Sequence, residues 1–145
     1  MGSKIVVDTS VLTKWFKTRG EELLTEARQL LEEVERRPVE VHVPALLLYE
    51  VANILLLKTR LGLAALEGAV ERLEALPFVV CPPATPLLKR ALRLGRQFGL
   101  TFYDASFLAL AVELDCPFVT ADQRLFEHTH SLQRVRHLSH VGPIG

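Results

Sequence analysis

The sequence predicts an α/β fold, a three-layer α/β/α sandwich with a central parallel β-sheet. Short runs of β-branched residues alternate along the chain with longer segments in which apolar residues recur at helical spacing. Strands that alternate with helices form parallel sheets with helices on both faces. The sequence has no internal repeat, low-complexity tract or linker, so we expect residues 1–145 to form a single domain.

The first strand is expected at residues 5–7, because three consecutive β-branched residues suit a buried parallel strand. A short helix should follow at 11–16. Apolar residues at helical spacing predict a second helix at about 21–37, which Pro38 ends. Alternating valines at 39–43 indicate the next strand.

The middle of the chain predicts a third helix, opened by Pro44 and reaching about Arg60, that is apolar nearly all round. Such a helix is either deeply buried or part of an oligomer interface. A fourth helix is expected at 63–76, with Leu66, Val70 and Leu73 facing inward. We expect strands at 78–81, 118–120 and 135–138, and helices at 84–98, 101–113 and from Asp122 to about His128.

Four acidic residues are the candidate catalytic and metal-binding groups. Asp8 and Asp122 each follow a predicted strand and so lie at the carboxyl edge of the sheet, where open α/β folds bind ligands. Glu50 and Asp104 lie in helical segments with apolar inward faces. Carboxylates that converge raise each other's pKa values, and a divalent cation removes that cost. Oxygen ligands alone favour Mg²⁺ or Mn²⁺.

Each acid also has a structural interpretation. Asp8 and Asp122 can cap the helices that follow them, and Asp104 can interact with a helix dipole behind a Thr101 cap. Glu50 can be an exposed residue on an interface helix. Only the four acids together favour a catalytic site.

Four segments, Val6-Val7-Asp8-Thr9-Ser10, Glu50-Val51-Ala52-Asn53, Tyr103-Asp104-Ala105 and Val119-Thr120-Ala121-Asp122, occur in an ordered set. Their order and approximate spacing resemble the PIN-domain ribonucleases, most closely the VapC-type toxins of prokaryotic toxin–antitoxin pairs. The resemblance covers essentially the whole chain, and all four acidic positions of the family pattern are present.

This resemblance implies an acidic Mg²⁺ or Mn²⁺ pocket formed by the four acids and lined by the polar side chains of Thr9, Ser10, Asn53 and Thr120. It implies cleavage of RNA, a homodimer, and a cognate antitoxin that inserts a segment into or near the pocket. A metal-activated water would then hydrolyse the phosphodiester without a covalent intermediate.

RNA binding requires a local basic surface, because 17 basic and 17 acidic residues leave no net charge. The candidates are Lys14, Lys17 and Arg19 near the first acid, and a basic helix face formed by Lys89, Arg90, Arg93 and Arg96. A solvated helix face is the preferred interpretation of that second set, ahead of RNA contact. Cys81 and Cys116 form no CxxC pair, and the sequence shows no signal peptide or membrane-spanning run, which favours the reducing cytoplasm.

Two other phosphate-handling enzyme classes place an acid after the first strand. A haloacid-dehalogenase-like phosphatase needs a second Asp where this chain has Ser10, and a receiver domain needs a late lysine that the last third lacks. The remaining alternative is a PIN-like module that binds RNA or protein without cleaving it.

Overall fold

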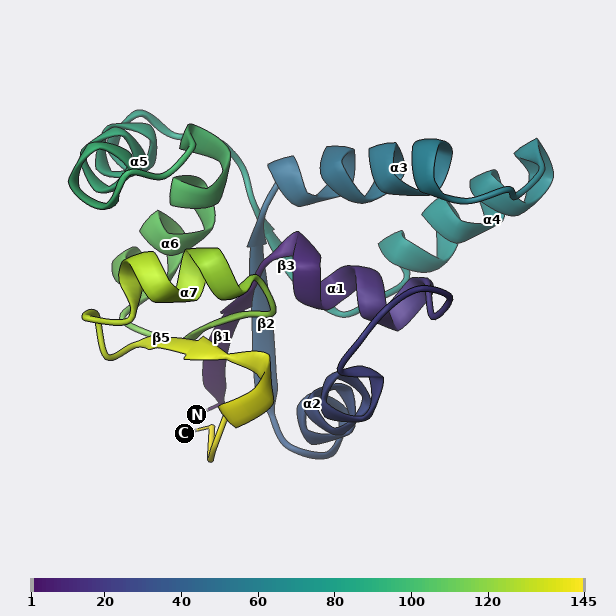
Figure 1. Ribbon diagram of the computed structural model, residues 1–145, viewed down its shortest axis with the longest axis horizontal. Helices are drawn as coiled ribbons and strands as arrows, with labels where there is room; N and C mark the ends of the chain where they lie inside the picture. The colour runs from purple at the N-terminus through teal and green to yellow at the C-terminus, as the bar shows by residue number, and fades with distance from the viewer. Residues whose placement is uncertain (1, 145) are drawn as a thin grey trace.

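A computed structural model describes residues 2–144, and its centre is a five-stranded sheet (Figure 1). The strand order is β3-β2-β1-β4-β5. The strands are β1 (Ser3–Val7), β2 (Val39–Pro44), β3 (Phe78–Cys81), β4 (Phe118–Thr120) and β5 (Val135–His137). Every pairing is parallel, which confirms the predicted sheet type.

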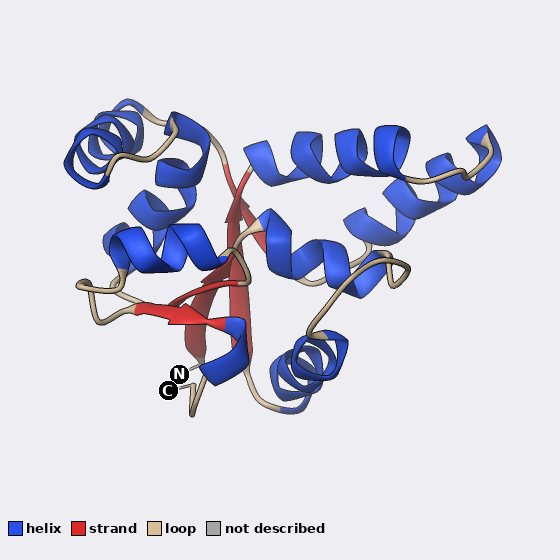
Figure 2. Cartoon of the chain, viewed as in Figure 1, coloured by secondary structure: helices blue, strands red, loops and turns tan. Residues whose placement is uncertain are grey.

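Helices cover both faces of this sheet, as predicted. They are α1 (Thr9–Phe16), α2 (Leu24–Arg36), α3 (Leu46–Lys58), α4 (Leu63–Glu74), α5 (Thr85–Phe98), α6 (Phe102–Leu114), α7 (Gln123–Thr129) and the short 3₁₀ helix Leu138–His140. Figure 2 shows α1 to α4 on one side of the strands and α5 to α7 on the other. Among residues 2–144, no helix combines the length and the hydropathy needed to cross a bilayer.

The strand order creates a switch point between β1 and β4. The chain proceeds from β1 outward to β2 and β3, and then returns to place β4 on the other side of β1. Because such crossovers are right-handed, the helices that follow β1 and β4 lie on opposite faces and leave a crevice at the carboxyl edge. Val7 pairs with Val119, so the two strands end side by side at this crevice.

The core explains why the central elements were predictable. Ile5, Val6 and Val7 of β1 are completely buried, as expected for a strand covered on both faces. Residues 105–111 of α6 are all buried, because α6 packs against β1, β2 and β4 on one side and against α5 on the other.

The outer helices differ from the predicted inward faces. In α4, Ala69 and Leu73 are buried while Val70 is 38% exposed. In α5, Leu87 and Ala91 are buried while Leu92 is 61% exposed. Each of these helices packs mainly against one neighbouring helix, α3 and α6 respectively, so only a narrow stripe is covered. The third helix, α3, buries a single stripe formed by Leu47, Val51 and Leu55. It is therefore not buried around its full circumference.

Candidate active site

Asp8 is held at the end of β1 by three hydrogen bonds. Its carboxylate accepts from the hydroxyls of Ser10 and Thr120, each at 2.5 Å and each on a different oxygen. It also accepts from the Val11 backbone N–H and so caps α1. The side chain is nearly buried, and its orientation is fixed on both oxygens.

The two hydroxyls also connect the segments that follow β1 and β4. Ser10 Oγ accepts a hydrogen bond from the Ala121 backbone N–H at 2.9 Å. Thr120 Oγ1 accepts from the Asp122 backbone N–H at 3.0 Å. Each hydroxyl therefore donates to Asp8 and accepts from the backbone near Asp122, which couples the positions of the two acids.

Glu50 and Asp104 lie at helix beginnings that face the same edge. Thr9 Oγ1 donates to Glu50 Oε1 at 2.7 Å, which joins the start of α1 to α3. Asp104 lies in the first turn of α6, where its backbone N–H donates to Thr101 Oγ1 at 3.1 Å. Because α6 precedes β4 in a parallel sheet, its first turn lies at the carboxyl edge.

Asp122 is exposed and caps α7 by accepting from the Leu125 backbone N–H at 3.0 Å. The capping interpretations of Asp8 and Asp122 are therefore correct as local structure. They do not compete with a catalytic interpretation, because a carboxylate that accepts one backbone hydrogen bond keeps further lone pairs for other ligands.

Electrostatic repulsion links all four acids. Burial raises the pKa of Asp8 to about 6, the charge of Asp104 adds to this rise, and the hydrogen bonds from Ser10, Thr120 and Val11 oppose it. Burial also raises the pKa of Glu50, again with a contribution from Asp104. The pKa of Asp104 is raised by burial and by Asp122. Asp104 is thus the shared neighbour of the other three carboxylates.

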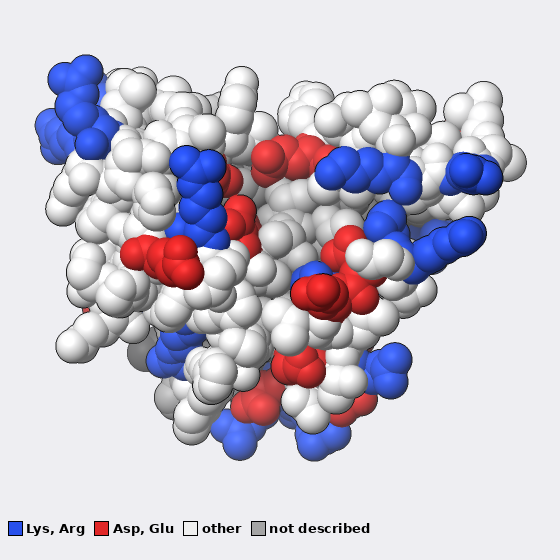
Figure 3. All heavy atoms as spheres, viewed as in Figure 1, with Lys and Arg blue, Asp and Glu red and all other residues white. Residues whose placement is uncertain are grey.

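Within residues 2–144, none of the four acids forms an ion pair with Lys, Arg or His. Figure 3 shows acidic side chains around a hollow in the middle of the visible face, between the α6–α7 side and α3. Partly buried carboxylates without cations are costly, which favours a bound cation at this place.

The donor set fits a hard divalent ion, because the four acids and the adjacent hydroxyls offer only oxygen atoms. In the side-chain positions of residues 2–144, no three His, Cys, Asp or Glu groups form a ready coordination cluster. The fit therefore rests on the donor chemistry and on the uncompensated charge.

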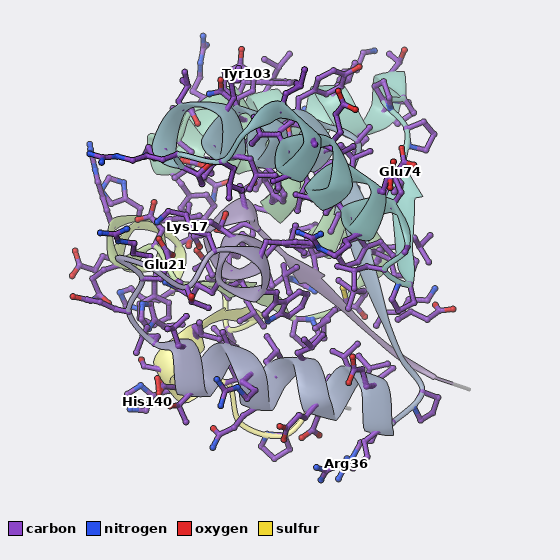
Figure 4. The ribbon with its side chains drawn as sticks, turned by 90° about the vertical axis from the view of Figure 1, so that its right-hand side faces the viewer. Lys17, Glu21, Arg36, Glu74, Tyr103 and His140 are labelled. Atoms are coloured by element: carbon purple, nitrogen blue, oxygen red, sulfur yellow. The ribbon has the colours of Figure 1, made fainter. Side chains whose placement is uncertain are left out.

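The other predicted site residues are placed differently. Asn53 is exposed, and no hydrogen bond from its amide is found within the described chain. Lys14 and Lys17 both contact Glu21, at 3.1 and 3.3 Å, and Figure 4 shows Lys17 beside Glu21.

The basic residues of α5 lie outside the acidic cluster. Arg90 pairs with Glu113 of α6 at 3.4 Å. Lys89, Arg93 and Arg96 are exposed on a helix that packs mainly on α6. Figure 1 shows α5 at the outer side of the molecule.

Exposed tyrosines lie next to two of the acids, and neither was predicted as a site residue from the sequence. Tyr49 precedes Glu50 and is 77% exposed, and Tyr103 precedes Asp104 and is 59% exposed. Figure 4 shows Tyr103 at the outer surface. Both border an uncharged cavity of about 250 Å³ lined by Pro44, Ala45, Leu46, Tyr49, Cys81, Pro82, Pro83, Leu87, Leu88, Phe102, Tyr103 and Ser106. Their position directly before a predicted site acid was the available signal.

Comparison with known proteins identifies the family. The model of the PIN domain family matches residues 5–131. This chain belongs to the PIN domain family. A curated relative, Ribonuclease VapC3 of Pyrobaculum aerophilum, is 31% identical over 128 residues, which span 86% of this chain and 93% of the relative.

Solved structures share the PIN fold. A toxin–antitoxin complex from Klebsiella pneumoniae has a chain with a TM-score of 0.70 and 20% identity, covering 94% of this chain and 99% of that one. The PAE2754 protein of Pyrobaculum aerophilum matches with a TM-score of 0.66 and 25% identity, over 96% of this chain and 93% of its own. The family resemblance inferred from the four acidic segments is confirmed.

Proposed function

We propose that this PIN domain protein is a metal-dependent endoribonuclease of the VapC toxin type that hydrolyses RNA phosphodiester bonds. The observation that carries the proposal is the group of four acids at the sheet's switch point, in which Asp104 interacts repulsively with the other three and none has a basic ion-pair partner among residues 2–144. The name and 31% identity of the ribonuclease relative support the same activity.

In this proposal, Asp8, Glu50, Asp104 and Asp122 hold Mg²⁺ or Mn²⁺. The ion, when bound, lowers the pKa of a water molecule and offsets charge on the attacked phosphate. Ser10 and Thr120 fix both oxygens of Asp8, and Thr9 fixes one oxygen of Glu50. Asp122 is exposed, so it lies where an incoming RNA strand can approach. Hydrolysis by water requires no covalent Ser, Cys or His intermediate.

The proposed partners are a cognate antitoxin and a second copy of the chain. An antitoxin that covers the acidic hollow would keep RNA away from it. The tyrosine-bordered cavity and the neighbouring edge of the sheet form an apolar surface suited to a homodimer. Both cysteines are free thiols, consistent with action in the cytoplasm.

The decisive experiment incubates antitoxin-free protein with a mixed RNA pool, with Mg²⁺ or Mn²⁺ and with EDTA. We expect cleavage only with metal, and none in Asp8→Asn or Asp104→Asn, because each change removes a metal-binding charge. Asp115→Asn is the matched control, because Asp115 is 90% exposed outside the cluster and Asn tolerates its left-handed backbone (φ 50°). The Asp115 variant should cleave like the wild type.

A non-catalytic PIN-like module would give a different result. The wild-type protein and the Asp8 variant would then both leave RNA intact, even if the wild type binds Mn²⁺. Undiminished cleavage in both the Asp8 and the Asp104 variants would instead reject the four-acid site.

A further inference from the structure

A second groove lies at the far end of the two helices that carry Thr9 and Glu50. It has a volume of about 610 Å³ and lies between the end of α1 and the turn that joins α3 to α4. The groove is lined by Phe16, Lys17, Thr18, Arg19, Leu55, Lys58, Thr59, Arg60 and Leu61. No acidic residue lines it, and four of its nine lining residues are basic.

Three of these cations are uncompensated. Lys17 interacts with Glu21 at 3.3 Å and donates to the Arg19 carbonyl, so its charge is partly neutralised. Arg19, Lys58 and Arg60 are exposed, and none has an ion-pair partner within residues 2–144. Three free cations around one concave surface form a binding site for negative charge.

The groove and the acidic cluster lie at opposite ends of the same two helices, α1 and α3. Asp8 caps the first turn of α1, and Lys17 follows its last residue. Lys58 is the last residue of α3, eight positions after Glu50, a rise of about 12 Å along a helix. The Thr9–Glu50 hydrogen bond holds the two helices together at the acidic end. Figure 3 shows basic side chains gathered beyond α3 and α1, to the right of the acidic hollow.

We propose that this groove binds the backbone phosphates of the RNA strand on one side of the bond that is cut. This inference rests on the proposed function. A cluster of four acids repels RNA, and the whole chain has no net charge, so substrate affinity must come from local cations near the site. Arg19, Lys58 and Arg60 meet that requirement, while α5 packs outside the cluster.

The test removes the three groove cations together, in the variant Arg19→Ala/Lys58→Ala/Arg60→Ala. Cleavage of a short single-stranded RNA is measured at several salt concentrations. We expect KM to rise about tenfold or more with kcat nearly unchanged, because the phosphates beside the scissile bond lose their contacts. The slope of log(kcat/KM) against log salt should shrink by about 2, since each phosphate contact on a single strand contributes about 0.7.

The matched control removes three exposed cations from α5, in Lys89→Ala/Arg93→Ala/Arg96→Ala. This variant loses the same charge, so it corrects for the overall field, and its KM should stay within about twofold of wild type. A charge-conserving variant, Arg19→Lys/Arg60→Lys, should retain most of the RNA affinity. Thermal unfolding of all variants checks that the exposed substitutions leave the fold intact.

Different outcomes separate the two proposals. If the wild type cleaves RNA and the groove variant keeps its KM and salt slope, the groove inference is wrong while the proposed function stands. If the groove variant keeps RNA affinity but loses affinity for its antitoxin, the groove is a protein-docking site and the inference is likewise wrong. If the wild type cleaves no RNA with either metal, the proposed function itself fails.

Discussion

Asp8 has two hydroxyl groups and one backbone N–H donating to its carboxylate at an almost completely buried position. These donors offset only part of the cost of burying the charge, because the pKa is still raised to about 6. At the residue scale, Asp8 is therefore held in a fixed orientation while burial disfavours its charged form. A bound metal ion would offset that cost of burial.

The Thr120 hydroxyl should be important for activity, because it contacts both the Asp8 carboxylate and the Asp122 backbone N–H. Thr120→Val keeps the size of this fully buried side chain but removes the donor to Asp8 and the acceptor for the Asp122 N–H. We expect metal-dependent cleavage to fall about 10- to 100-fold, the usual effect of losing a group that orients a metal ligand. Thr120→Ser keeps the hydroxyl and should retain most activity, so equal losses in both variants would assign the effect to packing.

The raised pKa of Asp8 predicts a pH-dependent stability in the metal-free protein. The folded state binds the Asp8 proton more tightly than the unfolded chain, with a pKa of about 6 against an ordinary value of 3.8. The ionised carboxylate therefore destabilises the fold, by an upper estimate of about 3 kcal/mol, above pH 6. This penalty disappears as the pH falls from 6 towards 3.8.

Asp8→Asn should consequently raise the Tm of the EDTA-treated protein by a few degrees at pH 7.5. The same comparison at pH 4 should give no increase, because the wild-type carboxyl is then largely protonated. Differential scanning calorimetry at both pH values measures this. A Tm advantage that is constant across this range would show that Asp8 is not the titrating group.

Sequence patterns revealed the acids because each site acid belongs to a regular element. Asp8 directly follows β1, and Asp122 follows β4 with only Ala121 between them, so the parallel pairing of β1 with β4 places the two acids at the same edge. The groove cations Lys58 and Arg60 were not predicted as binding residues, because their relation to α1 depends on the crossing of α1 and α3. Spacing along one helix does not encode that crossing.

At the scale of elements, the buried residues were predicted correctly where an element is covered on all sides. They were predicted incorrectly where a helix packs mainly against one neighbour. The buried strands and α6 follow from their continuous apolar runs. For α4 and α5, the apolar residues outnumber those that a single neighbouring helix can cover, so Val70 and Leu92 remain exposed. The second helix also begins late, because Leu23 adopts a left-handed backbone with φ 57°.

The packing of α5 on α6 positions Asp104, and Gly95 allows the close approach. A Cβ at Gly95 would lie 3.3 Å from the Leu100 carbonyl oxygen and 3.6 Å from Ala105 Cβ, next to the catalytic candidate. Gly95→Val should therefore destabilise the protein by about 1–3 kcal/mol and reduce cleavage by displacing the start of α6. Gly68→Val in α4 is the control, because a Cβ there meets only the flexible end of Arg72. In urea unfolding, the Gly95 variant should be less stable than the Gly68 variant. It should also cleave RNA more slowly.

At the scale of the whole molecule, β3 is the sheet edge nearest the tyrosine-bordered cavity. Val79 and Val80 are each 42% exposed on this edge strand. The next residue, Cys81, pairs with Pro44 of β2, and both residues line the cavity. Exposed edges and apolar patches of this kind favour association. The cavity lining contains no charged residue, so it can face its own copy across a two-fold axis without repulsion. The apolar end of α3 adjoins the basic groove and is less suited to self-association.

We therefore expect a homodimer that buries the cavity surface, with twice the 16.2 kDa mass of the chain in sedimentation. Leu88→Glu/Leu92→Glu should shift the protein to monomer, because two copies of the surface would then oppose like charges. Leu63→Glu is the control: Leu63 is 71% exposed at the start of α4, in the arm formed by α3 and α4 (residues 46–74), away from this cavity, and its variant should stay dimeric. A wild type that sediments only as a monomer would refute dimerisation. If Leu63→Glu dissociates the dimer and Leu88→Glu/Leu92→Glu does not, the interface lies on the α3–α4 arm instead. A dimer formed there would have to cover the basic groove and would compete with RNA.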